Sequence, residues 1–375
     1  MRRIAYLCVD PGVPVFGTKG ASVHVQEIIR AWRNRGAEVT VYCTRTGSDV
    51  PADLADLTVV VVPVTGKGAT REASQAAVAA ELAQRVLNDG ADAVYERYSL
   101  FSDALARVTA ELRIPGFLEV NAPLIDEQRT YRILHDETAA TAALQLQVAA
   151  ATRTVCVSDP VADWVRKRVD PGDHERIRTV ANGVNTDRIR PFPEAPGRPV
   201  VAFVGTLKPW HGVETLIEAQ ASGSRAWTLR VVGDGPQGPA LRSLAERVGA
   251  DVDFTGAVAP EKVPELLAGC AIAAAPYPST SNDGDQYFSP LKIYEYCAAG
   301  LPVVASRVGQ APHIIDDGVT GLLVEPSDPH ALSEAISSLA AAPLARAAMS
   351  SAARRAATER HSWDTVLNRI TQEVA

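Results

Sequence analysis

Short runs of apolar residues alternate with longer amphipathic stretches along the whole chain. Such runs, bounded by glycine, proline or polar residues, are typical of strands buried in a parallel sheet. The predicted strands before residue 190 are 4–9, 38–43, 57–64, 93–95, 116–120 and 154–157. Those after residue 199 are 200–204, 229–232, 252–258, 271–276, 301–305 and 321–324. Because helix-like segments separate the runs, the pattern predicts an α/β protein with two doubly wound parallel sheets.

A proline-rich stretch separates the two sets of predicted strands. Four of the residues in 191–199 are proline, and such a segment is extended and cannot join either sheet. We therefore expect the domain boundary there. The expected organisation is an N-terminal domain at 1–190, a linker at 191–199, a second domain at 200–355 and a C-terminal helix at 356–375.

Composition narrows the class of protein. With 375 residues and 46% hydrophobic content, the chain is long enough for two α/β domains of ordinary size. A net charge of -7 argues against a protein that binds nucleic acid. No segment has the ~18 uninterrupted apolar residues of a membrane span, so we expect peripheral membrane contact at most. The five cysteines lie mostly in or beside apolar runs without metal-like spacing, which favours reduced thiols and a cytoplasmic location.

The segment 282–306 has the highest density of residues typical of a binding site. A polar loop follows a predicted strand, and Ser289 and Pro290 then predict the start of a helix with Ser289 as its N-cap. A helix entered from the carboxyl end of a parallel strand points free N–H groups, here those of Leu291 and Lys292, at the place where anions bind. We therefore expect a phosphate site at the start of this helix.

Two charged residues follow on the same predicted helix. Lys292 and Glu295 are three positions apart and share a helix face, so a cation and a carboxylate lie about one turn inside the anion site. The amides and the lysine can hold phosphate oxygens, and the carboxylate can accept two ribose hydroxyls. This combination favours a sugar nucleotide as the ligand. The alternative is a capped surface helix with one ion pair.

The sequence SPLKIYEYCAAGLPVVAS, residues 289–306, resembles the signature of the retaining glycosyltransferases of family 4, which have the GT-B fold. The resemblance implies two Rossmann-like doubly wound domains that face a central crevice, with the terminal helices crossing back to the first domain. It also implies that Glu295, which matches the second glutamate of the signature, holds the ribose. Tyr287 stands where the family has its first glutamate, which binds the donor sugar, so the mode of sugar binding stays open.

The loop after the first strand of the second domain also departs from the family pattern. Members of the family have an Arg and a Lys there, where this chain has Thr206 and His211. Lys208 is the only strong cation left in the sequence 205–212. The resemblance therefore implies that Lys208 takes much of the diphosphate charge with help from Thr206 and His211, since charge grows on the leaving group. A solvated loop lysine is the alternative.

Further site residues come from glycine turns, strand ends and the family resemblance, and ordinary loop capping or packing is the alternative for each. The expected donor-binding residues are Gly17, Gly20, Gly205, Thr206, Lys208, His211, Gly233, Val258, Tyr287, Ser289, Pro290, Leu291, Lys292 and Glu295. The expected acceptor-side residues are Lys19, His24, Arg97 and Glu119. The expected catalytic residues are Lys208, Glu295 and Asn121.

One motif, Asp283-Gly284-Asp285, could bind a divalent cation, because Asp-x-Asp does so in the other large glycosyltransferase fold. Two complete α/β halves surround this motif, and no other metal ligands are evident in the sequence. We therefore favour a glycine turn over a metal site as the interpretation of this motif. We predict no metal and no cofactor, with a nucleotide-diphosphate sugar as co-substrate.

The patterns and the resemblance together predict a metal-independent, retaining glycosyltransferase. It would move a sugar from a nucleotide-diphosphate donor to a hydroxyl of a small-molecule or glycan acceptor. A second hypothesis is a catalytically silent nucleotide-sugar-binding protein, because three charged residues of the family pattern are replaced. A third is a nucleotide-sugar epimerase of the same architecture, which would need acid and base residues that the sequence does not reveal.

Overall fold

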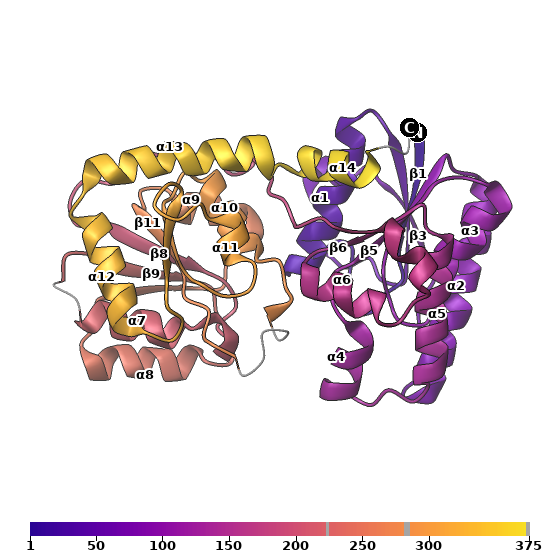
Figure 1. The fold of residues 1–375 in the computed structure, drawn as a ribbon, viewed down its shortest axis with the longest axis horizontal. Coiled ribbons are helices and arrows are strands. Elements are labelled where there is room, and N and C mark those ends of the chain that lie inside the picture. The colour runs from indigo at the N-terminus through magenta and orange to yellow at the C-terminus, as the bar shows by residue number, and fades with distance from the viewer. Residues whose placement is uncertain (223–224, 281–285, 373–375) are drawn as a thin grey trace. The chain divides into compact units, whose positions relative to one another are not determined.

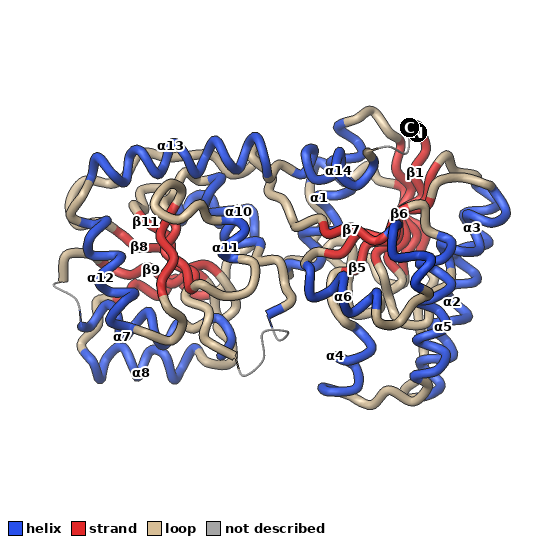
Figure 2. The backbone as a smooth tube through the Cα atoms, in the orientation of Figure 1, coloured by secondary structure: helices blue, strands red, loops and turns tan. Residues whose placement is uncertain are grey.

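The computed structural model describes residues 1–222, 225–280 and 286–372, and its chain divides into two compact units (Figure 1). The N-terminal unit comprises Met1–Asn182, Tyr287–Ser289 and Trp363–Ala375. The C-terminal unit comprises Gly183–Gln286 and Pro290–Ser362. Each unit contains one parallel sheet with helices around it (Figure 2), which confirms the predicted α/β class with two doubly wound sheets.

The sheet of the N-terminal unit has seven parallel strands in the order β3-β2-β1-β4-β5-β6-β7. The strands are β1 (Arg3–Cys8), β2 (Glu38–Cys43), β3 (Thr58–Val61), β4 (Ala93–Arg97), β5 (Gly116–Val120), β6 (Arg153–Cys156) and β7 (Ile177–Thr179). Six of them coincide with predicted strands. The edge strand β7 was not predicted, because two of its three residues are exposed and it has no apolar run. The strand order reverses between β1 and β4, the kind of place where open α/β sheets bind ligands.

Helices cover both faces of this sheet. On one face, Leu7 and Leu118 belong to a hydrophobic core that also contains side chains of α2, α3, α5 and α6. On the other face, Trp32 of α1 lies against Phe117 of β5, with ring centroids 6.2 Å apart. The helices are α1 (Gly20–Asn34), α2 (Ala69–Asp89), α3 (Ala104–Leu112), α4 (Leu124–Tyr131), α5 (Glu137–Ala150), α6 (Asp159–Arg166) and α14 (Trp363–Thr371).

Helix α14 belongs to the N-terminal unit although it is the last helix of the chain. Its Trp363 is buried and meets the ring of His24 edge-on, with centroids 4.8 Å apart. Arg35 of α1 donates to the side chain of Asn368 at 2.5 Å. Arg153 of β6 donates to the carbonyls of Arg369 and Ile370 in the last turn of α14, groups that a helix end leaves without intrahelical partners. These contacts hold α14 to elements from the start and the middle of the chain.

A buried carboxyl group at the end of β4 supports α3. Glu96 is fully buried, and it accepts hydrogen bonds from the Ser102 hydroxyl at 2.5 Å and the Leu105 amide at 2.8 Å. The side chain of the N-cap residue Asp103 makes no capping bond. The Glu96 carboxyl group accepts from the first turn of α3 instead, through the Leu105 amide. Burial raises the pKa of Glu96 to about 8, although the two hydrogen bonds act in the opposite direction.

Glu96 is expected to make stability fall as pH rises from 4.5 to 8. Its pKa in the folded protein is about 8 against an ordinary value of 4.5, so the folded state binds more protons in this window. Glu96→Gln can still accept from Leu105 and donate to Ser102, so it should keep the fold and flatten this slope. Urea unfolding of parent and variant across the window measures the difference, and equal slopes would contradict the expectation.

The sheet of the C-terminal unit has six parallel strands in the order β10-β9-β8-β11-β12-β13, with the order reversing between β8 and β11. All six coincide with predicted strands. The strands are β8 (Val200–Val204), β9 (Thr228–Val232), β10 (Val252–Gly256), β11 (Ile272–Ala275), β12 (Val303–Ser306) and β13 (Gly321–Val324). The helices are α7 (Val213–Ser222), α8 (Gly238–Val248), α9 (Val263–Leu267), α10 (Leu291–Ala298), α11 (Ala311–Ile314), α12 (Pro329–Ala340) and α13 (Pro343–Arg360).

The proline-rich stretch that was expected to be a linker, 191–199, lies in the C-terminal unit, and the change of unit falls after Asn182. Backbone bonds tie this part of the chain to that unit. The Val184 amide donates to the His361 carbonyl at 2.8 Å, and the Ala195 amide donates to the Gly269 carbonyl at 3.0 Å. The chain returns to the N-terminal unit at Tyr287–Ser289 and again between α13 and α14.

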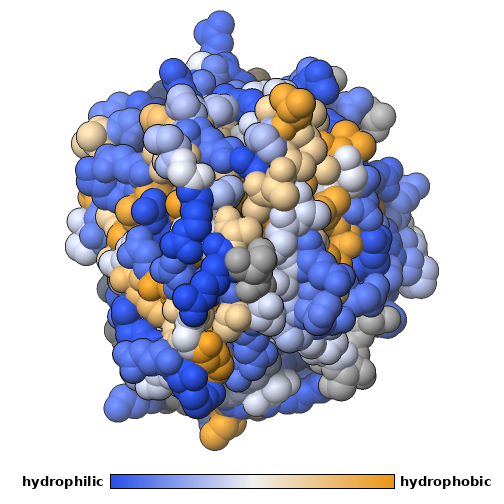
Figure 3. Space-filling model, turned by 90° about the vertical axis from the view of Figure 1, so that its left-hand side faces the viewer, coloured by the Kyte–Doolittle hydropathy of each residue, from blue (hydrophilic) through white to orange (hydrophobic). Residues whose placement is uncertain are grey.

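Among the described residues, no helix combines the length and the apolar character needed to cross a bilayer. On the face seen in Figure 3, hydrophilic residues predominate and apolar ones are scattered among them. All five cysteines lie in the described part of the chain, where they are buried and form no disulfide. Burial raises the pKa of the Cys43 thiol to about 11 and that of Cys297 to about 12, so both act as small apolar residues.

Candidate functional site

The helix predicted after the signature loop is present as α10, but its start differs from the prediction. Pro290 is the N-cap residue, and α10 begins at Leu291. The prediction of Ser289 as the N-cap is wrong, because its hydroxyl accepts a hydrogen bond from the Asn182 amide at 3.1 Å within the N-terminal unit. Proline offers no capping side chain, so α10 starts without the bond that a serine would have supplied.

The amino group of Lys292 is buried on the first turn of α10. Its Nζ lies 4.2 Å from the ring centroid of Phe203 and 5.4 Å from that of Tyr277, and it has no hydrogen-bond partner among the described residues. Burial lowers the pKa of Lys292 to about 7, while Glu295 acts to raise it. A buried cation without a hydrogen-bonded partner is costly, and an anion beside it would offset that cost.

Two glycines leave room beside this lysine. A Cβ at Gly205 would come within 2.9 Å of Lys292 Nζ, and a Cβ at Gly233 would come within 2.1 Å of the Gly205 carbonyl oxygen. Both have positive φ, 154° and 132°, which a side chain would strain. The turns that follow β8 and β9 therefore approach each other next to the amino group, where backbone can contact a ligand directly.

His211 is neutral in this site. Its Nδ1 lies 2.5 Å from the Thr206 carbonyl oxygen, which can only accept, so Nδ1 carries the proton and Nε2 is left as an acceptor. Burial lowers the pKa of His211 to about 3, with help from the positive charges of Lys292 and Lys208. The expected aid of His211 to a phosphate therefore needs a proton that the ring does not hold in the structure described here.

Lys208 contacts an aromatic ring. Its Nζ lies 4.5 Å from the ring centroid of Trp210, which is 51% exposed. Thr206, the other polar residue expected to hold phosphate here, is exposed. The loop thus presents one partly exposed cation, Lys208, and the start of α10 presents a buried one, Lys292. The assignment of Lys208 as the main phosphate ligand stays a prediction.

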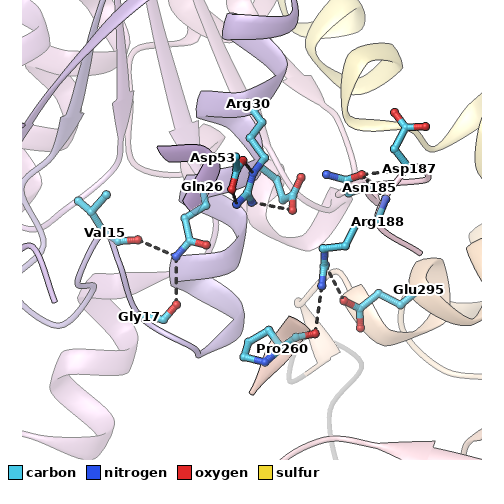
Figure 4. A network of polar contacts seen from close by, with 11 residues as sticks. Val15, Gly17, Gln26, Arg30, Asp53, Asn185, Asp187, Arg188, Pro260 and Glu295 are labelled. Carbon is cyan, nitrogen blue, oxygen red and sulfur yellow. Dashed lines mark hydrogen bonds and ion pairs between the residues drawn. The ribbon is translucent and has the colours of Figure 1, made fainter. Parts of the chain in front are cut away.

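Glu295 lies one turn further along α10, and an arginine that the sequence reasoning missed lies beside it (Figure 4). Arg188 Nη2 is 3.5 Å from Glu295 Oε1, and Arg188 Nη1 donates to the Pro260 carbonyl at 3.2 Å. Pro260 follows shortly after Val258, whose backbone was expected to hold the nucleotide base and whose side chain is half-buried. The sequence signal for Arg188 was its place a few residues after the dipeptide Asn182-Gly183, which is typical of a tight turn.

In the N-terminal unit, a buried contact between a histidine and a carboxylate joins α1 to β5. His24 Nε2 lies 2.7 Å from Glu119 Oε1, and both residues are buried. Burial acts to raise the pKa of Glu119, but His24, Arg97 and Tyr95 outweigh it and lower the pKa, so the carboxylate is ionised. The structure thus brings three of the expected acceptor-side residues together, while Lys19 is exposed at the start of α1.

Two further polar groups lie near this pair. Arg97 is the register partner of Glu119 in neighbouring strands. Arg97 Nη1 and Asn121 Oδ1 are buried atoms without a hydrogen-bond partner among the described residues. Buried polar atoms are seldom left unsatisfied, so each indicates a place for a ligand group or a water.

The glycine loop after β1 is held by a side chain of α1. Gln26 Nε2 donates to the carbonyls of Val15 at 3.0 Å and Gly17 at 3.1 Å (Figure 4). A Cβ at Gly17 would come within 2.6 Å of the Ser22 hydroxyl oxygen. Gly20 is the first residue of α1. The loop is therefore closely packed against the first turns of the helix.

Tyr287, at the position of the first family glutamate, belongs to the N-terminal unit. Its hydroxyl donates to Glu127 of α4, and its carbonyl accepts from the Ser158 hydroxyl at 2.5 Å. Its ring packs against the core of that unit. Asp283 and Asp285, the possible metal ligands, lie outside the described residues. Within the described ranges, no cluster of His, Cys, Asp and Glu side chains could hold a metal ion.

The two parallel sheets and their connections define a GT-B glycosyltransferase fold. The crystal structure of HepE from Anabaena in complex with UDP and glucose matches 100% of this chain and 99% of its own, with a TM-score of 0.72 and 21% identity. Sucrose-phosphate synthase from Thermosynechococcus elongatus matches 99% of this chain and 98% of its own, with a TM-score of 0.70 and 20% identity. At such identities the likeness establishes the fold alone.

Sequence comparison gives the family. Residues 18–188 match the model of "Glycosyltransferase Family 4", and residues 198–342 match that of "Glycosyl transferases group 1". The chain therefore belongs to glycosyltransferase family 4, as the signature at 289–306 had indicated.

Two curated relatives share about a third of their residues with part of this chain. One is a GDP-mannose-dependent alpha-(1-6)-phosphatidylinositol monomannoside mannosyltransferase of Mycolicibacterium smegmatis, 33% identical over 52% of this chain and 55% of that protein. The other is a D-inositol 3-phosphate glycosyltransferase of Saccharomonospora viridis, 32% identical over 58% of this chain and 53% of that protein. The matches span about half the length of each relative.

The affinity for a nucleoside diphosphate is expected to fall as pH rises above 7. The Lys292 amino group, with a pKa of about 7, is largely protonated below this value and neutral above it. A bound diphosphate stabilises the protonated form, so binding takes up a proton and weakens by up to about tenfold per pH unit. The phosphate itself, with a second pKa of ~6, is already ionised there. Titration calorimetry with UDP and GDP in buffers of different ionisation enthalpy measures the proton uptake.

Two lysine variants provide the control for this pH dependence. Lys292→Met removes the buried amino group but keeps the apolar stem, so it should raise the melting temperature by a few degrees and abolish the proton uptake. Lys208→Met, in the neighbouring loop, should weaken binding without removing the pH dependence. A pH-independent affinity in the parent, or proton uptake that survives in Lys292→Met, would contradict this role of Lys292.

Proposed function

We propose that this protein transfers a sugar from a nucleotide-diphosphate donor to a hydroxyl group of an acceptor, with retention of the anomeric configuration. The observation that carries the proposal is the buried Lys292 amino group without a hydrogen-bond partner among the described residues. It lies at the start of α10, beside Gly205 and one turn before Glu295. Helix amides, a cation and a carboxylate in this order match a diphosphate followed by a ribose.

The chemical step uses the charge of the C-terminal unit. The bond between the anomeric carbon and the diphosphate oxygen breaks, and the acceptor oxygen bonds to that carbon on the same face. The departing phosphate oxygen takes the acceptor proton, so no side-chain base is needed. Lys292 and the first amides of α10 stabilise the negative charge that grows on the phosphate, with Lys208 contributing from the loop.

The acceptor is proposed to bind to the N-terminal unit. Arg97 and Asn121 have buried polar atoms without partners among the described residues, and the ionised Glu119 lies beside Arg97. Such groups can donate to and accept from several hydroxyls of a polyol. The names of the two curated relatives, which specify inositol-containing acceptors, support the same chemical class.

A second candidate function is a nucleotide-sugar-binding protein without turnover. The observation that favours it is the neutral state of His211 at a position where the family has a lysine. The binding hypothesis predicts donor affinity without product. The transfer hypothesis predicts both.

A turnover assay tests the proposed function. GDP-mannose and UDP-glucose, the first from the name of a relative and the second from the crystal structure of HepE with UDP-glucose, are incubated with inositol, inositol phosphate and phosphatidylinositol acceptors in the presence of a chelator. The expected result is a glycoside with the anomeric configuration of the donor. Donor binding without product from any pair would favour the binding protein. A strict need for a divalent ion would revive the metal hypothesis for Asp283 and Asp285.

Glu295→Ala is expected to lose nucleotide affinity and keep its fold. Glu295 is only partly buried, with 21% of its side chain exposed, so its truncation should leave the fold intact, and loss of two charge-assisted bonds to ribose should cost roughly 2–5 kcal/mol. Glu265→Ala is the control, since its exposed carboxylate pairs only with Lys262 among the contacts observed. Calorimetry with the nucleoside diphosphate measures both variants. Unchanged affinity in a folded Glu295→Ala would refute the ribose assignment.

A further inference from the structure

The segment that enters the C-terminal unit forms a tight turn that aims one arginine at α10. The Asn185 side-chain oxygen accepts from the amides of Asp187 at 3.1 Å and Arg188 at 2.9 Å (Figure 4). The Ile189 amide donates to the Asn185 carbonyl at 3.0 Å. The side chain of Asn185 therefore fixes the backbone from which Arg188 extends.

A second arginine fastens this turn to the same helix. Arg354 of α13 donates to the carbonyls of Thr186 at 2.9 Å and Ile189 at 2.8 Å. It also donates to the carbonyl of Ala298, the last residue of α10, at 2.8 Å. Charge-assisted bonds of this kind are stronger than neutral ones. The turn therefore has a fixed place against the C-terminal end of α10.

Arg188 connects two parts of the proposed nucleotide site. One nitrogen of its guanidinium lies 3.5 Å from Glu295 Oε1, and another donates to the Pro260 carbonyl at 3.2 Å. The side chains of Arg188 and Glu295 are only 22% and 21% exposed. A planar guanidinium that holds two acceptors restricts the rotamers of the carboxylate and the position of the loop after β10.

We infer that Arg188 is a positioning residue that orients Glu295 toward the ribose hydroxyls and fixes the loop that contains Val258 and Pro260. This inference rests on the proposed nucleotide site and adds the residue on which its selectivity for ribose depends. A guanidinium that served stability alone would leave that selectivity unchanged. Arg188 acts through Glu295 and the loop, so it is not assigned a role in the chemical step.

The experiment compares each nucleoside diphosphate with its 2′-deoxy form by calorimetry. The parent should bind UDP or GDP more tightly than the deoxy form, because Glu295 accepts from the ribose hydroxyls. Arg188→Gln should lower the affinity for the ribonucleotide about tenfold or more and bring the ratio of the two affinities close to one. KM for the donor should rise more than kcat falls, since the lost contact serves binding in ground and transition state alike.

Two comparisons separate positioning from a structural effect. Arg190→Gln is the matched control, because Arg190 lies two residues further on, is 68% exposed and pairs with Asp187; it should leave the affinity ratio unchanged. Arg188→Gln combined with Glu295→Gln should lose little more than Glu295→Gln alone, since both changes remove the same interaction. If Arg188→Gln does not fold, Asn185→Ala, which loosens the turn, should lower the same ratio.

The outcomes distinguish this inference from the proposed function. If the parent binds neither UDP nor GDP, the proposed function is refuted. If the parent binds and discriminates against the deoxy form but a folded Arg188→Gln keeps both the affinity and the ratio, the positioning role is refuted and the proposed function stands. Additive losses in the double variant would likewise overturn the claim that Arg188 acts through Glu295.

Discussion

The arrangement of the C-terminal unit centres on a buried amino group that has no hydrogen-bond partner within the described part of the chain. Lys292 extends from the first turn of α10 over the rings of Phe203 and Tyr277, and Gly205 lies close to its amino group. The helix start, the two glycine turns and the aromatic residues all shape the space around this amino group. Burying a charged amino group without a partner is unfavourable, and a bound anion of matching size would offset this cost. The cost therefore contributes to the affinity for such an anion.

The sequence predicted the fold well because buried parallel strands have an unmistakable apolar pattern. Twelve strands were predicted and found, and the one that was missed, β7, is a short edge strand with two exposed residues. The site was predicted less completely. The signature on α10 revealed Lys292 and Glu295, but Ser289 does not cap the helix, because its hydroxyl accepts from Asn182, which is more than a hundred residues away in sequence. No local pattern contains such a contact.

The charges around the proposed diphosphate site were harder to predict, because protonation depends on burial. From the sequence, both His211 and Lys208 could carry a positive charge in the loop 205–212. In the structure, burial and two neighbouring lysines keep His211 neutral, and the ring of Trp210 contacts Lys208. The strongest candidate for the cation is instead on α10. Arg188 was not predicted for a related reason. Its contact partner Glu295 lies on α10, about a hundred residues later in the sequence, so no local pattern around Arg188 contains this contact.

The packing of α14 in the N-terminal unit has a consequence for producing this unit as a separate fragment. The N-terminal unit contains residues from both ends of the chain, because Trp363–Thr371 packs on α1 and Arg153. The contact between Arg153 and Ile370 spans 217 positions of the sequence, so it cannot form before α14 has been synthesised. A fragment that stops at Asn182 would expose the surface of α1 that Trp363 covers. An autonomous version of this unit would therefore need the final helix joined to it by a new linker.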